Sequence, residues 1–196
     1  LVDRLRAKHP QVQFESCASG GGRSDLGALS HFDEVWPSDN TDAIDRMTLQ
    51  KTYTLLRPVK TMRAWVTDVG GPNKPTSLEF RFNIAMQGAK SICADQTKYT
   101  EAYMQICREN VALYKEIRPL VQFGDLYRLA DADEDEFLCT QYVNKSKTES
   151  VVFLAARGTR FYKKRVTLRL AGLDPVRRYR LEFDGKMIEK SGAYLM

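Results

Sequence analysis

Residues 31–57 read HFDEVWPSDNTDAIDRMTLQKTYTLLR and decide the fold. The apolar segment His31–Trp36 ends at a proline and a serine, which predicts a short strand followed by a loop. A helix is expected to begin near Asp39 or Thr41, with acidic side chains in its first turn, and to run to about Arg57 before the next proline. The stretch therefore predicts a strand, a loop and a helix in succession.

The same order recurs on both sides of this stretch. The other predicted elements are strands at 12–14, 59–66 and 91–94, a helix opened by the capping box Thr76-x-x-Glu79, and a long helix from about 99 to 118. Alternating strands and helices imply a parallel sheet with helices outside it. About four such units are half of an eight-unit barrel, so we expect residues 1–118 to form the second half of a (β/α)8 TIM-type barrel.

The pattern of predicted secondary structure changes after Pro119. We predict no helix there but four strands, separated by turn residues that include the hairpin signal Asp184-Gly185, at 137–143, 151–156, 166–170 and 179–183. The alternation of apolar and polar residues is typical of sheets with one face exposed to solvent. The fold class predicted is α/β plus all-β, with an antiparallel β-sandwich over 119–196, cut short at its end, and the acidic run 131–136 as a surface turn.

Composition excludes several classes of protein. The 196 residues are 43% hydrophobic and 28% charged, which fits a globular domain and not a collagen-like or disordered chain. The 30 basic and 25 acidic residues leave a net charge of +5, and the basic stretch 157–169 alternates as the solvent face of a strand. We therefore expect no nucleic-acid partner. No apolar run approaches the roughly 20 residues of a membrane span, so no membrane partner is expected.

The cysteines and histidines do not predict a metal site. The four cysteines are widely spaced without a Cys-x-x-Cys pair, and the chain has two histidines, whereas structural zinc needs about four ligands in close pairs. Cys93, Cys107 and Cys139 are most simply interpreted as buried, apolar-like residues. His31 has no partner at ligand spacing and is interpreted as a structural histidine.

Two polar loops follow predicted strands, where functional side chains of a parallel barrel lie. In the first loop, the glycine triplet at 20–22 would let a ligand approach the backbone closely. It lacks the spacing of a phosphate-binding loop, and it is also typical of a flexible connector. In the second, Asp39 and Asp42 fit a helix cap, with Asp42 and Arg46 as an ion pair. The alternative makes one carboxyl a general acid beside Trp36, whose ring could stack on a sugar.

Taken together, the two loops resemble those of glycoside hydrolase family 36, the α-galactosidase family. The resemblance rests on Ser16-Cys17-x-x-Gly20-x-x-Arg23 and on Trp36-x-Ser38-Asp39-x-x-Asp42-x-x-x-Arg46. Segments 66–69 and 80–88 also look like later barrel segments of that family. Spaced motifs in the right order over about 80 residues are a far more specific signal than any one motif.

The resemblance implies a retaining exo-α-galactosidase that needs no metal or organic cofactor. Asp39 corresponds to the general acid/base, and Cys17 and Gly20 correspond to positions that contact the sugar. Trp36 is expected to bind the substrate as well, and Arg23, Asp42 and Arg46 are expected to support the site. In a retaining enzyme a second carboxylate attacks the sugar from about 5 Å away. In the family it lies in a Lys-Trp-Asp segment, which this sequence lacks. The isolated chain is therefore expected to be inactive.

The substrate implied is an α-galactoside oligosaccharide, and a homo-oligomer is expected for a full-length enzyme. Alternatives are an α-galactosyltransferase or α-N-acetylgalactosaminidase on the same scaffold, or a non-catalytic carbohydrate-binding module. Both ends of the sequence look like cuts in a longer protein, and the compartment, cytoplasmic or periplasmic, stays open.

Overall fold

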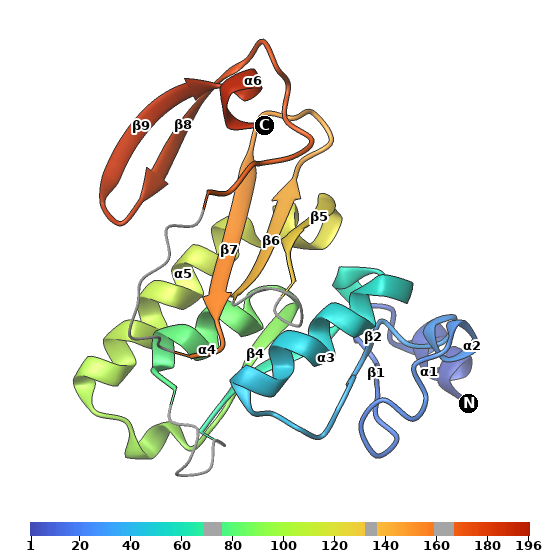
Figure 1. The fold of residues 1–196 in the computed structure, drawn as a ribbon. Helices are drawn as coiled ribbons and strands as arrows, with labels where there is room; N and C mark the ends of the chain where they lie inside the picture. Colours follow the sequence, from blue (N-terminus) through green and yellow to red (C-terminus); the bar gives the residue numbers. More distant parts are fainter. Residues whose placement is uncertain (69–75, 132–136, 159–166) are drawn as a thin grey trace. The chain divides into compact units, whose positions relative to one another are not determined.

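The computed structural model describes residues 1–68, 76–131, 137–158 and 167–196 (Figure 1). The chain divides into two compact units, Leu1–Arg118 and Pro119–Met196, and the long helix α5 crosses the division. Each unit is described by itself.

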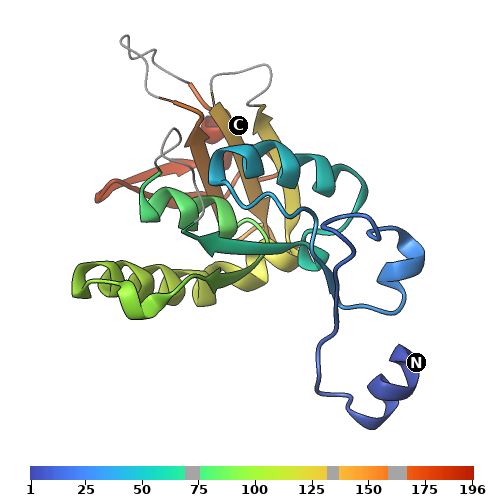
Figure 2. The same cartoon turned by 90° about the horizontal axis from the view of Figure 1, so that it is seen from below.

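The first unit alternates helices with short parallel strands. In chain order its α-helices and strands are α1 (Val2–Lys8), β1 (Glu15–Ser16), α2 (Leu26–Leu29), β2 (Glu34–Val35), α3 (Ala43–Leu56), β3 (Arg63–Thr67), α4 (Leu78–Ala85), β4 (Ala89–Cys93) and α5 (Glu101–Phe123). Two short 3-10 helices, η1 (Val59–Thr61) and η2 (Gln96–Lys98), precede β3 and α5, so the strand predicted at 59–66 begins only at Arg63. Strand β1 pairs with β2 and β3 pairs with β4, both in parallel. An isolated parallel bridge between Val35 and Met62 connects the two pairs, so the strands follow one another in chain order. The N-terminal helix α1, dark blue in Figure 2, lies at the margin of this unit and buries no residue.

The core of the first unit lies between the strands and the helices α3 and α4. Ala64 and Val66 of β3 are fully buried, as is Phe82 of α4. In α3, Met47 lies on the buried face, and the Gln50 amide donates to the Ile84 carbonyl of α4 at 2.9 Å. The predicted order of strand, loop and helix therefore matches the observed order in this unit.

Helix α3 begins later than the sequence suggested. Its N-cap is Asp42, whose carboxylate accepts hydrogen bonds from the backbone N–H groups of Ile44 and Asp45, both at 3.0 Å. The start near Thr41 lies one residue from this cap, whereas the start near Asp39 was wrong, because Asp42 is the residue whose carboxylate satisfies the first free N–H groups of the helix. Asp39 lies three residues before this cap and outside the helix.

The second unit is antiparallel. Strands β5 (Asp125–Ala130), β6 (Phe137–Val143) and β7 (Ser150–Ala156) form one sheet, β8 (Arg178–Phe183) and β9 (Lys186–Ser191) form a hairpin, and α6 (Gly192–Leu195) follows. Val143, Leu173 and Tyr179 form a buried cluster that joins the hairpin to the sheet. The fully buried Gln141 has its amide satisfied, because it donates to Ser150 Oγ and Ala171 O and accepts from Ala171 N.

Several expected element boundaries were wrong. The strand expected at 12–14 lies at 15–16, and the capping box Thr76-x-x-Glu79 is replaced by Ser77, whose hydroxyl accepts from Phe80 N at 3.2 Å. The strand expected at 166–170 is absent over 167–170, and its first residue lies outside the described residues. Strands β5 and β9 were not predicted. Most of the acidic run 131–136 and of the basic stretch 157–169 also lie outside the described residues.

Helix α5 does not end at Arg118 but continues through Pro119 to Phe123. Proline removes one backbone hydrogen bond, and the burial of Val121, two residues later and 1% exposed, favours continuing the helix past it. The last turn closes with a 2.8 Å hydrogen bond from Gly124 N to Leu120 O.

Candidate active site

The two motif loops of the first unit are in direct backbone contact. Gly20 has a positive φ of +69°, and a Cβ atom built on it would lie 2.8 Å from Asp39 N and 2.9 Å from Ser38 Cα. A Cβ atom on Gly21 would lie 2.3 Å from Pro37 O. The glycines are therefore required by the close approach of the two loops, and not by flexibility.

The loop that carries Asp39 is held by its own polar groups. Asn40 Oδ1 accepts from Asp42 N at 3.0 Å, which fixes the turn before helix α3. From the end of β3, the Thr67 hydroxyl donates to the Thr41 carbonyl at 3.3 Å. These hydrogen bonds fix residues 40–42, directly after Asp39, and tie the loop that follows β2 to the C-terminal end of β3.

The Asp39 side chain is exposed, and one of its oxygens is held by Trp36. The indole Nε1 donates to Asp39 Oδ1 at 3.2 Å. In a protonated Asp39 this contact leaves Oδ2 to carry the proton, because Oδ1 already accepts from the indole. The structure thus separates the two acidic residues of the motif: Asp42 caps a helix, whereas Asp39 presents a carboxyl group to solvent.

Both faces of the Trp36 ring are covered. Trp65 of β3 stacks on it with ring centroids 4.0 Å apart and an interplanar angle of 28°. The Arg46 guanidinium lies over the ring at 4.6 Å from its centroid, and Trp36 as a whole is 3% exposed. The expectation that a sugar stacks on the Trp36 ring was therefore wrong, since neither face is open, and the contact that Trp36 makes in the site is with Asp39.

Arg46 of α3 is buried and satisfied by backbone carbonyls. It is 2% exposed, and its guanidinium donates to Arg63 O at 2.9 Å and to Ser38 O at 3.4 Å. Burial lowers the pKa of Arg46 to about 10, which keeps it charged at neutral pH. In the part of the chain that the structure describes, Asp42 and Arg46 form no ion pair, because the Arg46 guanidinium donates to the carbonyls of Ser38 and Arg63 instead.

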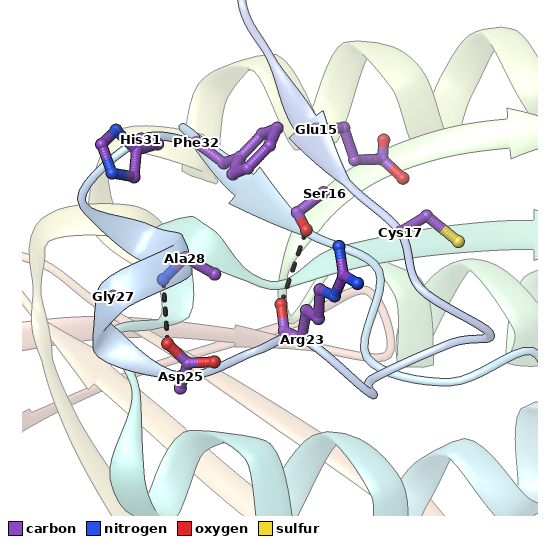
Figure 3. A pocket seen from close by; sticks show the side chains of 9 residues that line it. All are labelled: Glu15, Ser16, Cys17, Arg23, Asp25, Gly27, Ala28, His31 and Phe32. Atoms are coloured by element: carbon purple, nitrogen blue, oxygen red, sulfur yellow. Dashed lines mark hydrogen bonds between the residues drawn. The ribbon is translucent and has the colours of Figure 1, made fainter. Parts of the chain in front are cut away.

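A hollow of about 520 Å³ opens beside β1 (Figure 3). Glu15 and Cys17 point to one side of the strand and Ser16 to the other, where the Ser16 hydroxyl donates to Arg23 O at 3.5 Å. The Cys17 thiol is exposed. Cys17 and Arg23 line this hollow, whereas Gly20, Trp36 and Asp39 do not; the other lining residues are Glu15, Ser16, Asp25, Gly27, Ala28, His31 and Phe32.

Sequence reasoning missed two contributions from β3. Arg63 joins the first three strands, with its guanidinium 2.9 Å from Glu34 Oε1 and 3.3 Å from Glu15 Oε2. Burial raises the pKa of Glu34, and the Arg63 charge opposes that rise. Trp65 lies two residues further on, against Trp36. A strand was predicted here, but no local pattern indicates which side chains of another strand it meets.

The histidine and the three other cysteines considered in the sequence lie outside the two motif loops. His31 lies 2.9 Å from the Asp3 carboxylate and is exposed. Cys107 and Cys139 are buried as expected, but the expectation for Cys93 was wrong because it is exposed at the end of β4. Within the described ranges, no group of three or more His, Cys, Asp or Glu side chains could hold a metal ion, and no helix is long and apolar enough to cross a membrane.

Comparison with known proteins assigns both units. The family profile named Melibiase matches residues 1–124, and the profile of the glycosyl hydrolase family 36 C-terminal domain matches residues 138–196. The α-galactosidase AgaA of Geobacillus stearothermophilus is 36% identical over 186 residues, which are 93% of this chain and 25% of that protein.

Solved structures agree with this assignment. The crystal structure of the family 36 α-galactosidase AgaB from the same organism has a TM-score of 0.93 and 36% identity, over 100% of this chain and 27% of that one. A variant of AgaA in complex with raffinose has a TM-score of 0.92 and 34% identity, over 99% and 27%. The chain thus spans about a quarter of the length of these relatives. With Melibiase matching residues 1–124 and the C-terminal domain matching 138–196, the chain belongs to glycoside hydrolase family 36.

Proposed function

We propose that this chain supplies the acid/base part of the active centre of a retaining exo-α-galactosidase, as part of a longer protein that cleaves terminal galactose from α-galactoside oligosaccharides. The observation that carries the proposal is the placement of Asp39: its loop abuts Gly20, and Trp36 holds one of its carboxyl oxygens. The raffinose complex of a relative supports the class of substrate.

In the first step Asp39 acts as a general acid. The proton on Oδ2 moves to the glycosidic oxygen while a carboxylate nucleophile attacks the anomeric carbon, so the C–O bond to the leaving group breaks and a glycosyl–enzyme ester forms. In the second step the ionised Asp39 removes a proton from water, which displaces the nucleophile and releases galactose. Asp39 ends the cycle protonated, as it began.

The nucleophile has to come from outside this sequence. Retention needs the two carboxyl groups about 5 Å apart. The sequence has no Lys-Trp-Asp segment, and neither Trp36 nor Trp65 is followed by an acidic residue. The chain alone is therefore expected to give no turnover.

Cys17 and Gly20 are proposed to contact the sugar. The Cys17 thiol is exposed at the end of β1, and Gly20 presents its backbone next to Asp39 without a side chain in the way. Arg23, Asp42 and Arg46 support the two loops through structure rather than through contact with the substrate.

The proposed architecture is the second half of a (β/α)8 barrel followed by a β-sandwich. The chain-order parallel strands of the first unit and the antiparallel strands of the second support it. In the longer protein the hollow beside β1 would then lie against the preceding barrel strand.

The test is Asp39→Asn in the longer protein, assayed on raffinose and on a nitrophenyl α-galactoside. We expect kcat/KM on raffinose to fall by about 10²-fold or more, because the poor leaving group needs a proton. Glu182→Gln, an exposed carboxylate of β8, is the control. Unchanged raffinose turnover in Asp39→Asn would remove Asp39 from the mechanism. Binding of galactose without hydrolysis by the unmodified protein would instead support a carbohydrate-binding module.

A further inference from the structure

We infer that Arg46 is a positioning residue for the Asp39 carboxyl group, acting through Trp36 and the Ser38 carbonyl. The inference rests on the proposed function of Asp39. Arg46 has no contact with Asp39 among the described residues, so its influence has to pass through the groups it touches.

The Trp36 indole is held on both faces. Trp65 lies on one face at 4.0 Å between centroids, and Arg46 covers the other at 4.6 Å. A ring held in this way cannot rotate its N–H away from Asp39 without losing both stacking partners. The direction of the Nε1–H bond toward Asp39 Oδ1 is therefore set by Arg46 and Trp65.

The cation also acts on the strength of that hydrogen bond. A guanidinium over an aromatic face draws electron density from the ring, which makes the indole N–H a stronger donor. Arg46 is buried, so this effect is poorly screened by solvent. A stronger hydrogen bond to Oδ1 favours the acid form that carries its proton on Oδ2, where it can reach the leaving oxygen, and it stabilises the carboxylate that remains after the proton has moved.

Arg46 fixes the backbone as well. Its second contact, with the Ser38 carbonyl at 3.4 Å, is one peptide unit before Asp39. The third, with Arg63 O at 2.9 Å, anchors the guanidinium to β3. The same side chain thus ties the Asp39 backbone and the Trp36 ring to the start of that strand.

The test compares two substrates in the longer protein. Trp36→Phe keeps an aromatic ring, although a smaller one, but removes the N–H donor. Arg46→Met removes the cation, and Arg46→Lys restores a cation without the planar fork. Raffinose needs a proton on its leaving oxygen, whereas a dinitrophenyl α-galactoside does not. The quantity to compare is the ratio of kcat/KM on raffinose to kcat/KM on the dinitrophenyl galactoside, because this ratio is independent of the fraction of protein that is folded.

We expect the ratio of kcat/KM on raffinose to kcat/KM on the dinitrophenyl galactoside to fall by about 10-fold or more in Trp36→Phe and Arg46→Met. Arg46→Lys should recover part of the loss. The matched control is Arg57→Met, because the Arg57 guanidinium also lies over an aromatic ring, Tyr53 at 5.3 Å, and donates to a backbone carbonyl, that of Ser24. Its ratio should stay within about threefold of the unmodified protein.

Two outcomes would separate this inference from the proposed function. Suppose that Asp39→Asn lowers the ratio, whereas Arg46→Met lowers kcat/KM on both substrates by the same factor. Arg46 is then only structural, and the inference fails while the proposed function stands. If Asp39→Asn leaves the ratio unchanged, the proposed function itself fails. A fall in the ratio for Arg57→Met as large as that for Arg46→Met would also overturn the inference.

Discussion

Gly20 and Asp39 are nineteen positions apart in sequence, and a Cβ atom on the first would lie 2.8 Å from the backbone nitrogen of the second. The position of the candidate acid thus depends on the absence of a side chain in the other motif loop. This contact means that the conformations of the two motif loops depend on each other.

Replacing Gly20 by alanine should therefore damage both stability and activity. The substitution adds a Cβ atom against backbone and also strains a φ of +69°, so we expect a loss of about 2–3 kcal/mol in the free energy of unfolding, measured with urea. Gly185→Ala, at φ +67° in open space, isolates the strain, and Gly158→Ala has neither problem. A loss no larger than that of Gly185→Ala would contradict the close contact.

Asp39 and Asp42 should contribute differently to the free energy of unfolding. Asp42→Ala removes the cap of α3 and should cost about 1 kcal/mol, whereas Asp39→Ala should stay within about 0.5 kcal/mol. Asp42→Ser, which can still cap, is the control and should recover most of the loss. Equal losses at the two positions would show that Asp39 also holds the helix.

The order of the elements could be predicted from sequence because it depends on local periodicity, as in the stretch that ends β2 and begins α3. The role of Trp36 could not. Its position at a strand end was visible, but the residues that cover its faces come from β3 and α3. Pro119 shows the converse: a strong local stop signal was outweighed by the burial of Val121.

The cysteines should differ in reactivity. Cys17 and Cys93 are exposed, whereas Cys107 and Cys139 are buried, and burial raises the pKa of Cys139 to about 11. Because the thiolate is the reactive form, a thiol reagent should titrate two groups in the folded chain and four in denaturant. Cys17→Ser and Cys93→Ser should each remove one of the fast groups. Fast labelling of Cys139 would contradict the burial of β6.

Gln141 should be essential to the second unit. Gln141→Ala leaves the N–H and C=O groups of Ala171 without the side-chain partner they have now, and the loss should be about 2–4 kcal/mol in urea unfolding. Gln105→Ala, on the exposed side of α5, is the control and should stay within about 0.5 kcal/mol. A small effect at Gln141 would mean that water replaces the amide.

Lys90 should make the stability of the first unit change with pH in the alkaline range. Its Nζ atom is buried without a hydrogen-bond partner among the described residues and lies over the rings of Phe82 and Tyr114, at 4.9 and 5.1 Å. Burial lowers the pKa of Lys90 from 10.5 to about 8, with a further lowering by Lys115 and an opposing effect of Cys107.

The sign follows from proton binding. Between pH 8 and 10.5 the unfolded chain holds a proton on Lys90 that the folded chain has lost, so the contribution of Lys90 to the free energy of unfolding should rise with pH. The Cys107 thiol, whose pKa is raised by burial, contributes in the opposite direction, so the Lys90 contribution is measured as the difference between variants. Allowing for partial solvent exposure, the rise is about 1–2 kcal/mol. Lys90→Met should remove it, whereas Lys186→Met, at an exposed position of β9, should keep it. Urea unfolding of the three proteins at pH 7, 9 and 10.5 measures the difference. If Lys90→Met and the unmodified chain keep parallel pH profiles, Lys90 is charged throughout and its cage of two aromatic rings stabilises the ammonium ion.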